Sequence, residues 1–146
     1  MAYKVNKSKK RAKALAKGYR SGLEDENSEH LKAHGVKFTF EKTKIKWVDP
    51  AKNRTYTPDF VLENGIIVET KGRFVTKDRQ KHLEVRKQYP DLDIRFVFNY
   101  SRSKINRGSK TSYADWCNKH GFIYADKFIP TEWFETKGSD KDDNDK

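Results

Sequence analysis

The chain has 146 residues, which is the size of one domain with a modest hydrophobic core. Its 32 lysines and arginines outnumber its 21 acidic residues, for a formal net charge of +11, so a polyanion such as nucleic acid is the expected partner. No apolar run is long enough to span a membrane, and no secretory hydrophobic region is evident. The single cysteine, Cys117, cannot form an internal disulfide and fits a reducing cytoplasm.

The two ends of the chain differ from its middle. Residues 1–18 are basic, without acids and with few large apolar residues, and are predicted to form a disordered arm that contacts phosphates. A solubilising tail is the alternative for this segment. Residues 135–146 mix acids and bases with a Gly-Ser pair and are predicted to be a second disordered segment. This leaves residues 19–134 as the folded domain.

A helix is predicted from Ser21 to about His34, with Gly35 as its C-terminal stop. Ser21 and Glu24 have the spacing of a capping box. Without further information, Glu24 is therefore predicted only to cap this helix. Alternating apolar residues from Val36 to Trp47 then predict one or two strands. The segment from Trp47 to Arg54 has no turn glycine and fits an extended connector as well as a loop.

The centre of the sequence predicts a β-hairpin, because an apolar run is broken by Asn64-Gly65. A two-residue loop would pair Asp59 with Thr70 and place Asp59 and Glu69 on opposite faces. A three-residue loop, with Gly65 left-handed, pairs Leu62 with Ile66 and therefore Asp59 with Glu69. We expect this second register.

In that register Asp59, Glu69 and Lys71 project from one face, since side chains alternate along a strand. Two carboxylates so close repel each other unless a cation lies between them, and Mg²⁺ or Mn²⁺ suits such oxygen ligands. The pattern Pro58-Asp59, then Glu69-Thr70-Lys71, is typical of PD-(D/E)xK nucleases. The alternative is a solvated hairpin face with an ordinary cross-strand ion pair. Apolar residues at both odd and even positions indicate that these strands are covered on both faces of the sheet. Ionisable side chains are costly in such a place, which favours the nuclease interpretation.

The C-terminal half predicts further alternation of helices and strands. A helix is expected from Thr76 to Tyr89, with Val85 and Tyr89 facing inward, followed by a buried strand over Ile94–Phe98. Residues 101–110 form a basic loop that is suited to phosphate contact, although a solvated surface loop fits equally. The remaining predictions are a capped helix from Ser112 to His120, a strand over Phe122–Tyr124, and closure of the core by Phe128, Ile129, Trp133 and Phe134. Together these elements predict an α/β domain with a mixed sheet.

Five motifs occur in order along residues 19–134: Arg20-Ser21-Gly22-Leu23-Glu24, Tyr56-Thr57-Pro58-Asp59-Phe60, Asn64-Gly65-Ile66, Val68-Glu69-Thr70-Lys71-Gly72 and Ala125-Asp126-Lys127. In this combination the chain resembles the phage endonuclease I family of Holliday-junction-resolving enzymes. The resemblance implies a restriction-endonuclease-like α/β fold: a mixed β-sheet flanked by helices. It also implies metal-dependent cleavage of four-way junctions and other branched DNA, leaving 5′-phosphate and 3′-hydroxyl ends.

The resemblance further implies an active site of Glu24, Asp59, Glu69 and Lys71. Asp59, Glu69 and the Thr70 backbone carbonyl would be ligands of Mg²⁺, and Glu24 would help to hold a second ion. Mn²⁺ is expected to substitute for Mg²⁺. Lys71 would act on the attacking water.

An intertwined homodimer is implied as well, in which residues 19–46 are exchanged between subunits across a connector at 47–52, and residues 53–134 form the main body. Glu24 of one chain would then complete the site of the other. The expected place of action is the cytoplasm of an infected bacterium, with no membrane partner. The basic residues expected to contact DNA are Lys9, Lys10, Arg11, Lys13, Arg20, Arg73, Arg102, Lys104 and Arg107.

Two other functions remain open from the sequence. One is a restriction-type or repair nuclease that acts on duplex DNA. The other is an architectural DNA-binding protein whose carboxylates are purely structural.

Overall fold

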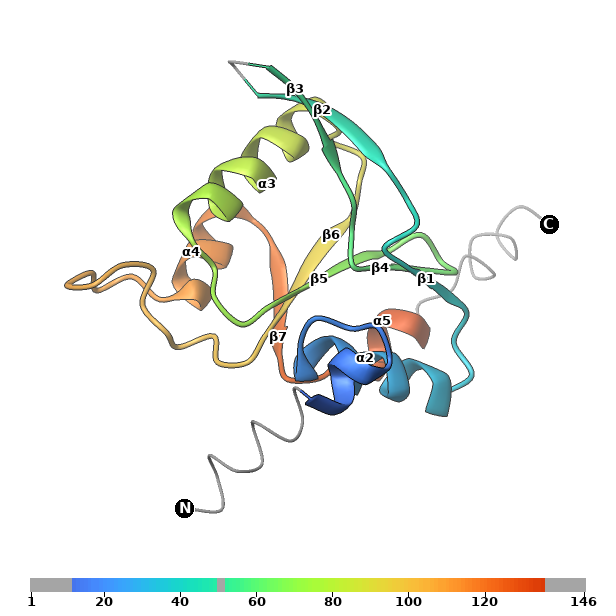
Figure 1. Ribbon diagram of the computed structural model, residues 1–146. Helices are drawn as coiled ribbons and strands as arrows, with labels where there is room; N and C mark the ends of the chain where they lie inside the picture. The colour runs from blue at the N-terminus through green and yellow to red at the C-terminus, as the bar shows by residue number, and fades with distance from the viewer. Residues whose placement is uncertain (1–11, 50–51, 136–146) are drawn as a thin grey trace.

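The computed structural model describes residues 12–49 and 52–135. Within them a five-stranded sheet has the strand order β1-β4-β5-β6-β7 (Figure 1). Antiparallel pairing joins β1 (Phe38–Phe40), β4 (Phe60–Leu62) and β5 (Ile67–Lys71), and parallel pairing then joins β5 to β6 (Ile94–Phe98) and β6 to β7 (Ile123–Asp126). The predicted α/β fold with a mixed sheet is confirmed.

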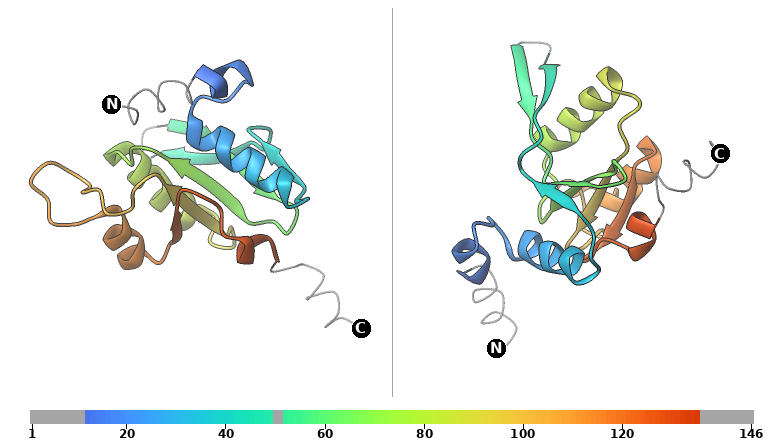
Figure 2. Two further views of the ribbon diagram at one scale, coloured as in Figure 1. Left: turned by 90° about the horizontal axis from the view of Figure 1, so that it is seen from below. Right: turned by 90° about the vertical axis from the view of Figure 1, so that its right-hand side faces the viewer.

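Helices cover both faces of the sheet (Figures 1 and 2). On one face α3 (Thr76–Gln88) and α4 (Tyr113–His120) pack through residues such as Val85 and Trp116. On the other, α2 (Gly22–Ala33) and α5 (Thr131–Glu135) pack through residues such as Leu31 and Trp133. Alternate strand residues enter the two cores, which confirms that the central strands are buried on both sides.

The β4–β5 hairpin has the three-residue loop that brings the two acidic residues together. Phe60 pairs with Val68 and Val61 with Ile67. The pairing continues to Leu62, whose N–H donates to the Ile66 carbonyl. Gly65 has a φ of 93°, in the left-handed region. The expected register, with Asp59 opposite Glu69, is confirmed.

A second, two-stranded sheet projects beside α3 (Figure 1). It consists of β2 (Ile45–Asp49) and β3 (Lys52–Tyr56), paired antiparallel from Ile45 with Tyr56 to Asp49 with Lys52. Gln88, at the end of α3, exchanges hydrogen bonds with the Val48 backbone and holds the ribbon against the helix. The segment that fitted either a connector or a loop is therefore a hairpin within this chain.

The predicted helices occur with small differences at their ends. Ser21 Oγ accepts a hydrogen bond from the Glu24 N–H, but the Glu24 side chain accepts from Arg20 N–H and not from Ser21, so only half of the predicted capping box forms. The Ser112 capping box is complete, and Gly121 ends α4 with a φ of 76°.

Two aromatic residues do not face inward as predicted. Tyr89 is 38% exposed, because α3 ends at Gln88 and the Tyr89 hydroxyl instead donates to the Lys46 carbonyl. Phe128 is 44% exposed, whereas its neighbour Ile129 is fully buried.

The described part of the basic arm is partly helical. Residues 12–16 form a helical segment in which Ala14 is fully buried, and Lys17 pairs with Asp25 of α2. This order was not expected from composition, and it arises because the short segment packs on the folded domain. The rest of the arm and the residues after 135 lie outside the described residues. None of the helices in the described ranges is both long and apolar enough to cross a bilayer.

We expect Gly65→Ala to lower the free energy of unfolding by about 1–2 kcal/mol, because a side chain disfavours the left-handed backbone. A Cβ at Gly65 would meet no atom within 4 Å, so backbone strain alone is tested. Urea titration of Gly65→Ala beside Glu63→Ala, an exposed position in the same turn, measures this cost. Equal stability of the two variants would contradict the left-handed turn.

Candidate active site

Asp59, directly before β4, and Glu69, in the middle of β5, lie against each other. The Asp59 backbone N–H donates to Glu69 Oε2 at 2.8 Å. In return, the backbone N–H and the hydroxyl of Thr70 both donate to Asp59 Oδ2 at 2.9 Å. Each carboxylate is therefore held by the backbone of the opposite strand, and their orientation follows from the hairpin register.

Lys71 completes the group expected from the nuclease motif. Its Nζ lies 3.7 Å from Glu69 Oε1 and 3.4 Å from Asp78 Oδ1. Asp78 lies in the first turn of α3. This turn follows β5 directly in the chain, which places its side chains at the carboxyl end of that strand, beside Lys71.

Glu24 reaches the same place from α2. One carboxylate oxygen from each of Glu24, Glu41 and Asp59 lies within 4.8 Å of the others. Arg20 also lies here, because its Nη2 is 2.6 Å from Glu41 Oε2 and 4.0 Å from Asp59 Oδ1. The four residues predicted as catalytic are thus gathered in one region, with Glu41 as an additional carboxylate.

Burial makes these carboxylates difficult to ionise. Glu24, Asp59 and Glu69 are only 7%, 5% and 3% exposed. Burial, opposed in part by hydrogen bonds from Thr70, raises the pKa of Asp59. Burial and then the Asp59 charge raise the pKa of Glu69 to about 8, and burial likewise raises that of Glu24. Such a site favours a bound cation, which stabilises the ionised forms.

The donor set fits a divalent metal ion. The clustered oxygens of Glu24, Glu41 and Asp59 are hard ligands, separated by distances that small side-chain movements would adapt to one ion. Glu69 lies outside this cluster, and its Oε2 is engaged by the Asp59 N–H. The predicted ligand role of the Thr70 carbonyl remains a prediction.

Two buried polar residues lie behind Glu69. His82 of α3 is fully buried, with Nε2 3.9 Å from Glu69 Oε1. Burial, followed by the charges of Lys81 and Lys71, lowers the pKa of His82 well below its ordinary value, so the imidazole is neutral. Tyr56 of β3 is 2% exposed and packs edge-on against His82.

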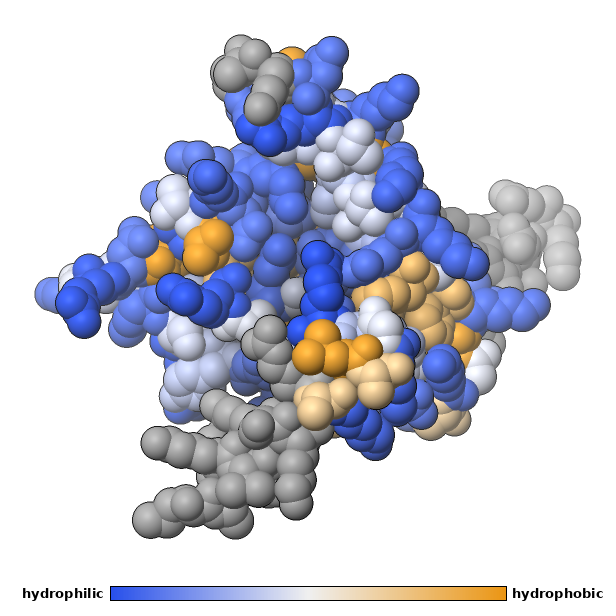
Figure 3. Space-filling model, in the orientation of Figure 1, coloured by the Kyte–Doolittle hydropathy of each residue, from blue (hydrophilic) through white to orange (hydrophobic). Residues whose placement is uncertain are grey.

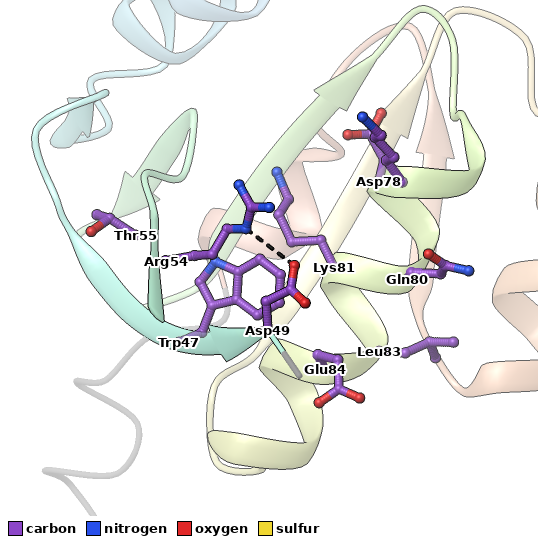
Figure 4. A pocket seen from close by; sticks show the side chains of 10 residues that line it. Trp47, Asp49, Arg54, Thr55, Asp78, Gln80, Lys81, Leu83 and Glu84 are labelled. Carbon is purple, nitrogen blue, oxygen red and sulfur yellow. Dashed lines mark hydrogen bonds and ion pairs between the residues drawn. The ribbon is translucent and has the colours of Figure 1, made fainter. Parts of the chain in front are cut away.

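A cavity of about 800 Å³ opens beside the site, between the β2–β3 ribbon and α3 (Figure 4). Arg54 and Lys81 extend into it from β3 and α3 (Figure 4). Asp78, the partner of Lys71, also lines it. Burial, and then repulsion from Lys71, lowers the pKa of Lys81.

A basic loop follows β6 and lies at the same end of the sheet as the site. Lys71 pairs with Phe98 in the parallel register, so the chain leaves β6 at the level of Lys71. Both the backbone N–H and the hydroxyl of Ser101 donate to the Asp126 carboxylate, and Ile105 N–H donates to the Thr111 carbonyl. The loop is therefore tied down at its base.

The residues predicted to contact DNA are distributed over several segments, on a molecule whose visible face in Figure 3 is mostly hydrophilic. Arg20 adjoins the site, Arg73 is exposed two residues after Lys71, and Lys13 is exposed in the 12–16 helical segment. Arg102, Lys104 and Arg107 are exposed in the basic loop, and Lys9, Lys10 and Arg11 lie outside the described residues.

Sequence reasoning missed Glu41, Asp78 and Lys81. Glu41 follows a three-residue strand and has a φ of 53°, a conformation that nothing in its sequence context signals. Asp78 and Lys81 had a usable signal, because a helix that follows a strand begins at the carboxyl end of that strand, where ligand sites of parallel sheets lie.

A mixed sheet that presents two carboxylates and a lysine on adjoining strands is the arrangement expected of the PD-(D/E)xK class of nucleases. The family model described as Phage endonuclease I matches residues 1–143 of the chain. The chain is also 54% identical over 126 residues to "Endonuclease I" of Escherichia phage T7, with 85% of each chain covered. It is 54% identical over 114 residues to "Endodeoxyribonuclease 1" of Enterobacteria phage T3, covering 78% of this chain and 75% of the relative. The chain belongs to the phage endonuclease I family, as its motifs predicted.

The raised pKa of Glu69 predicts a pH-dependent stability. Between its ordinary value of 4.5 and about 8, the folded protein holds a proton that the unfolded chain has lost, so without metal the stability falls as pH rises through this window. The loss is a few kcal/mol at most, since one unit is worth about 1.4 kcal/mol. Glu69→Gln should flatten the decline.

Urea titrations from pH 4 to pH 9 in a chelator, about one unit apart, measure this effect. Glu63→Gln removes an exposed carboxyl from the same hairpin and should follow the parent protein. A parent-like decline in Glu69→Gln would assign the pH dependence to other groups.

Proposed function

We propose that this protein is a Mg²⁺-dependent, structure-selective DNA endonuclease that resolves four-way junctions and cleaves other branched DNA. Mn²⁺ is expected to substitute for Mg²⁺. The protein would act as a homodimer in the cytoplasm of an infected bacterium. The printed names of its relatives, an endonuclease and an endodeoxyribonuclease, support the DNA-cleaving activity.

The convergence of Asp59, Glu69 and Lys71 with Glu24 is the observation that carries this proposal. Three carboxylates that are each less than a tenth exposed destabilise a fold without a cation. Lys71, within 4 Å of Glu69, adds a proton-bearing group beside the carboxylates. An architectural DNA-binding protein has no need for this set.

Hydrolysis of the phosphodiester assigns a task to each side chain. A bound metal ion would polarise the phosphate oxygens and make a bound water more acidic. Asp59 and Glu69 would hold that ion, and Glu24, with Glu41 beside it, would help to hold a second one. Lys71 orients or deprotonates the attacking water and offsets the negative charge that develops on phosphorus. The water oxygen bonds to phosphorus as the bond to the 3′ oxygen breaks, leaving 5′-phosphate and 3′-hydroxyl ends.

Recognition of branched DNA rests on shape and on phosphate positions, because a branch point has no fixed base sequence. The basic loop at residues 101–110, together with Arg20 and Arg73, lies at or near the site and supplies cations for this purpose. A net charge of +11 adds long-range attraction to DNA.

Asp59→Ala and Lys71→Ala should each abolish cleavage while leaving junction binding nearly intact, since both side chains belong to the chemical step. Single-turnover cleavage of a labelled four-way junction and a gel-shift titration measure the two properties. Lys77→Ala, an exposed lysine in the first turn of α3, is the matched control and should retain cleavage. Full activity in either site variant would refute the assignment.

The inactive Asp59→Ala protein also distinguishes this function from that of a duplex-specific nuclease. At fixed salt, a four-way junction should displace the bound junction far better than a duplex of the same sequence. Equal competition by the two DNAs would favour the restriction-type or repair-type alternative.

The homodimer is proposed to exchange residues 19–46, which carry Glu24, across the connector at residues 47–52. Domain swapping keeps the contacts of the closed chain but makes them between subunits. The approach of Glu24 to Asp59 would then join two chains, whereas its contact with Arg20 would stay within the exchanged segment. The β2–β3 ribbon is suited to be the hinge, because its five residue pairs would form equally well between two copies.

Co-expression of a Glu24→Ala chain with an Asp59→Ala chain tests this exchange. In a swapped heterodimer, one composite site lacks both side chains and the other is intact, so the mixture should nick one strand of a junction. If Glu24 acts within its own chain, each site carries one lesion and no activity returns.

The heterodimer is purified through two different affinity tags, one on each chain. The readout is the appearance of nicked junction DNA. Homodimers of each variant, prepared in parallel, are the controls and should be inactive. Purified heterodimers without nicking activity would contradict the shared site.

A further inference from the structure

Unpartnered polar atoms in the described part of the chain are concentrated behind one carboxylate. Among the described residues, four buried side-chain nitrogen or oxygen atoms have no hydrogen-bond partner: Trp47 Nε1, Tyr56 Oη, and both ring nitrogens of His82. Three of the four belong to the two residues that lie behind Glu69. Because buried polar groups nearly always find partners, this clustering calls for a physical reason.

The geometry directs these groups at Glu69. His82 Nε2 is 3.9 Å from Glu69 Oε1, a distance beyond hydrogen bonding that a carboxylate movement of about 1 Å would close. The Tyr56 hydroxyl approaches the same carboxylate: after burial, the charge of Glu69 and a weak side-chain hydrogen bond with it raise the Tyr56 pKa, although the contact falls short of ordinary hydrogen-bond geometry. A neutral imidazole and a phenol each offer one hydrogen to a carboxylate.

Glu69 already has contacts within the hairpin. Its Oε2 accepts from the Asp59 N–H, and Lys71 Nζ lies 3.7 Å from Oε1. Tyr56 and His82 are fixed by packing, since His82 lies edge-on between the rings of Tyr56 and Phe96. The His82 ring of α3 therefore approaches Oε1, the Glu69 oxygen that accepts no hydrogen bond from the hairpin and that also lies near the Lys71 ammonium.

We propose that Tyr56 and His82 are positioning residues that donate hydrogen bonds to Glu69 and set its carboxylate for metal binding. This inference rests on the proposed function, because it assigns Glu69 to the metal. Such outer contacts orient ligands, and their loss typically weakens metal affinity or activity by about 10–100-fold. Neither residue touches substrate or metal in this role.

Tyr56→Phe is the decisive variant because it removes a single oxygen and keeps the packed ring. We expect the dissociation constant for Mn²⁺, measured by titration calorimetry without DNA, to rise about tenfold or more. The kcat for junction cleavage should fall similarly while KM is unchanged. The melting temperature in chelator should not fall, since the lost hydroxyl has no partner.

Tyr113→Phe is the matched control. Tyr113 is also buried, but its hydroxyl accepts a hydrogen bond from the Phe74 N–H at 3.2 Å, away from the carboxylates. This variant should melt at a lower temperature and yet bind Mn²⁺ and cleave as the parent does. The two tyrosines thus separate positioning from structural support.

His82 provides a second comparison. His82→Leu removes both ring nitrogens and should weaken Mn²⁺ binding, whereas His82→Gln retains an N–H near the Nε2 position and should recover part of the affinity. If neither His82 variant folds, Tyr56→Phe alone decides.

Parent-like Mn²⁺ affinity and kcat in Tyr56→Phe would overturn the positioning role and leave the proposed nuclease untouched. A drop in melting temperature without any change in Mn²⁺ affinity would do the same, because it marks the hydroxyl as structural. A parent protein that neither binds Mn²⁺ nor cleaves DNA would instead refute the proposed function, and this inference with it.

Discussion

The reciprocal hydrogen bonding of Asp59 and Glu69 is the constraint on which the rest of the site depends. Each carboxylate accepts from a backbone N–H of the other strand, so neither can turn away without breaking the pairing of β4 with β5. This arrangement requires the register that the three-residue loop imposes. A shift by one residue would send Asp59 and Glu69 to opposite faces of the sheet and separate their carboxylates.

The same arrangement places negative charge where the protein cannot solvate it. Cationic side chains only partly offset this cost: Arg20 and Lys71 approach Asp59 and Glu69, yet the pKa of each carboxyl remains raised. The buried carboxylates thus lower the free energy of unfolding and favour the binding of a cation. Such a loss of stability is common where function needs an unfavourable arrangement. The two apolar cores on either side of the sheet provide the stability that makes this tolerable.

Local chemistry explains which parts of the site could be predicted. Asp59, Glu69 and Lys71 follow from strand alternation and one turn, so the sequence alone placed them together. Glu24 required the family resemblance, because the same spacing also predicts a helix cap, and in the structure its backbone N–H does bond to Ser21 Oγ. Glu41 could not be found, since its position depends on an unusual backbone angle and on the pairing of β1 with β4. The inward orientation predicted for Tyr89 is wrong, because periodicity does not say where α3 ends.

The basic loop after β6 is closed at its base by Asp126 and by the backbone hydrogen bond between Ile105 and Thr111, while residues 106–108 form an exposed tip. Because the base carries the anchoring contacts, the tip can change in length or charge without transmitting strain to β6 or to Lys71. Under the proposed function, substitutions at the tip would change the affinity for DNA without moving the carboxylates and Lys71 beside the loop.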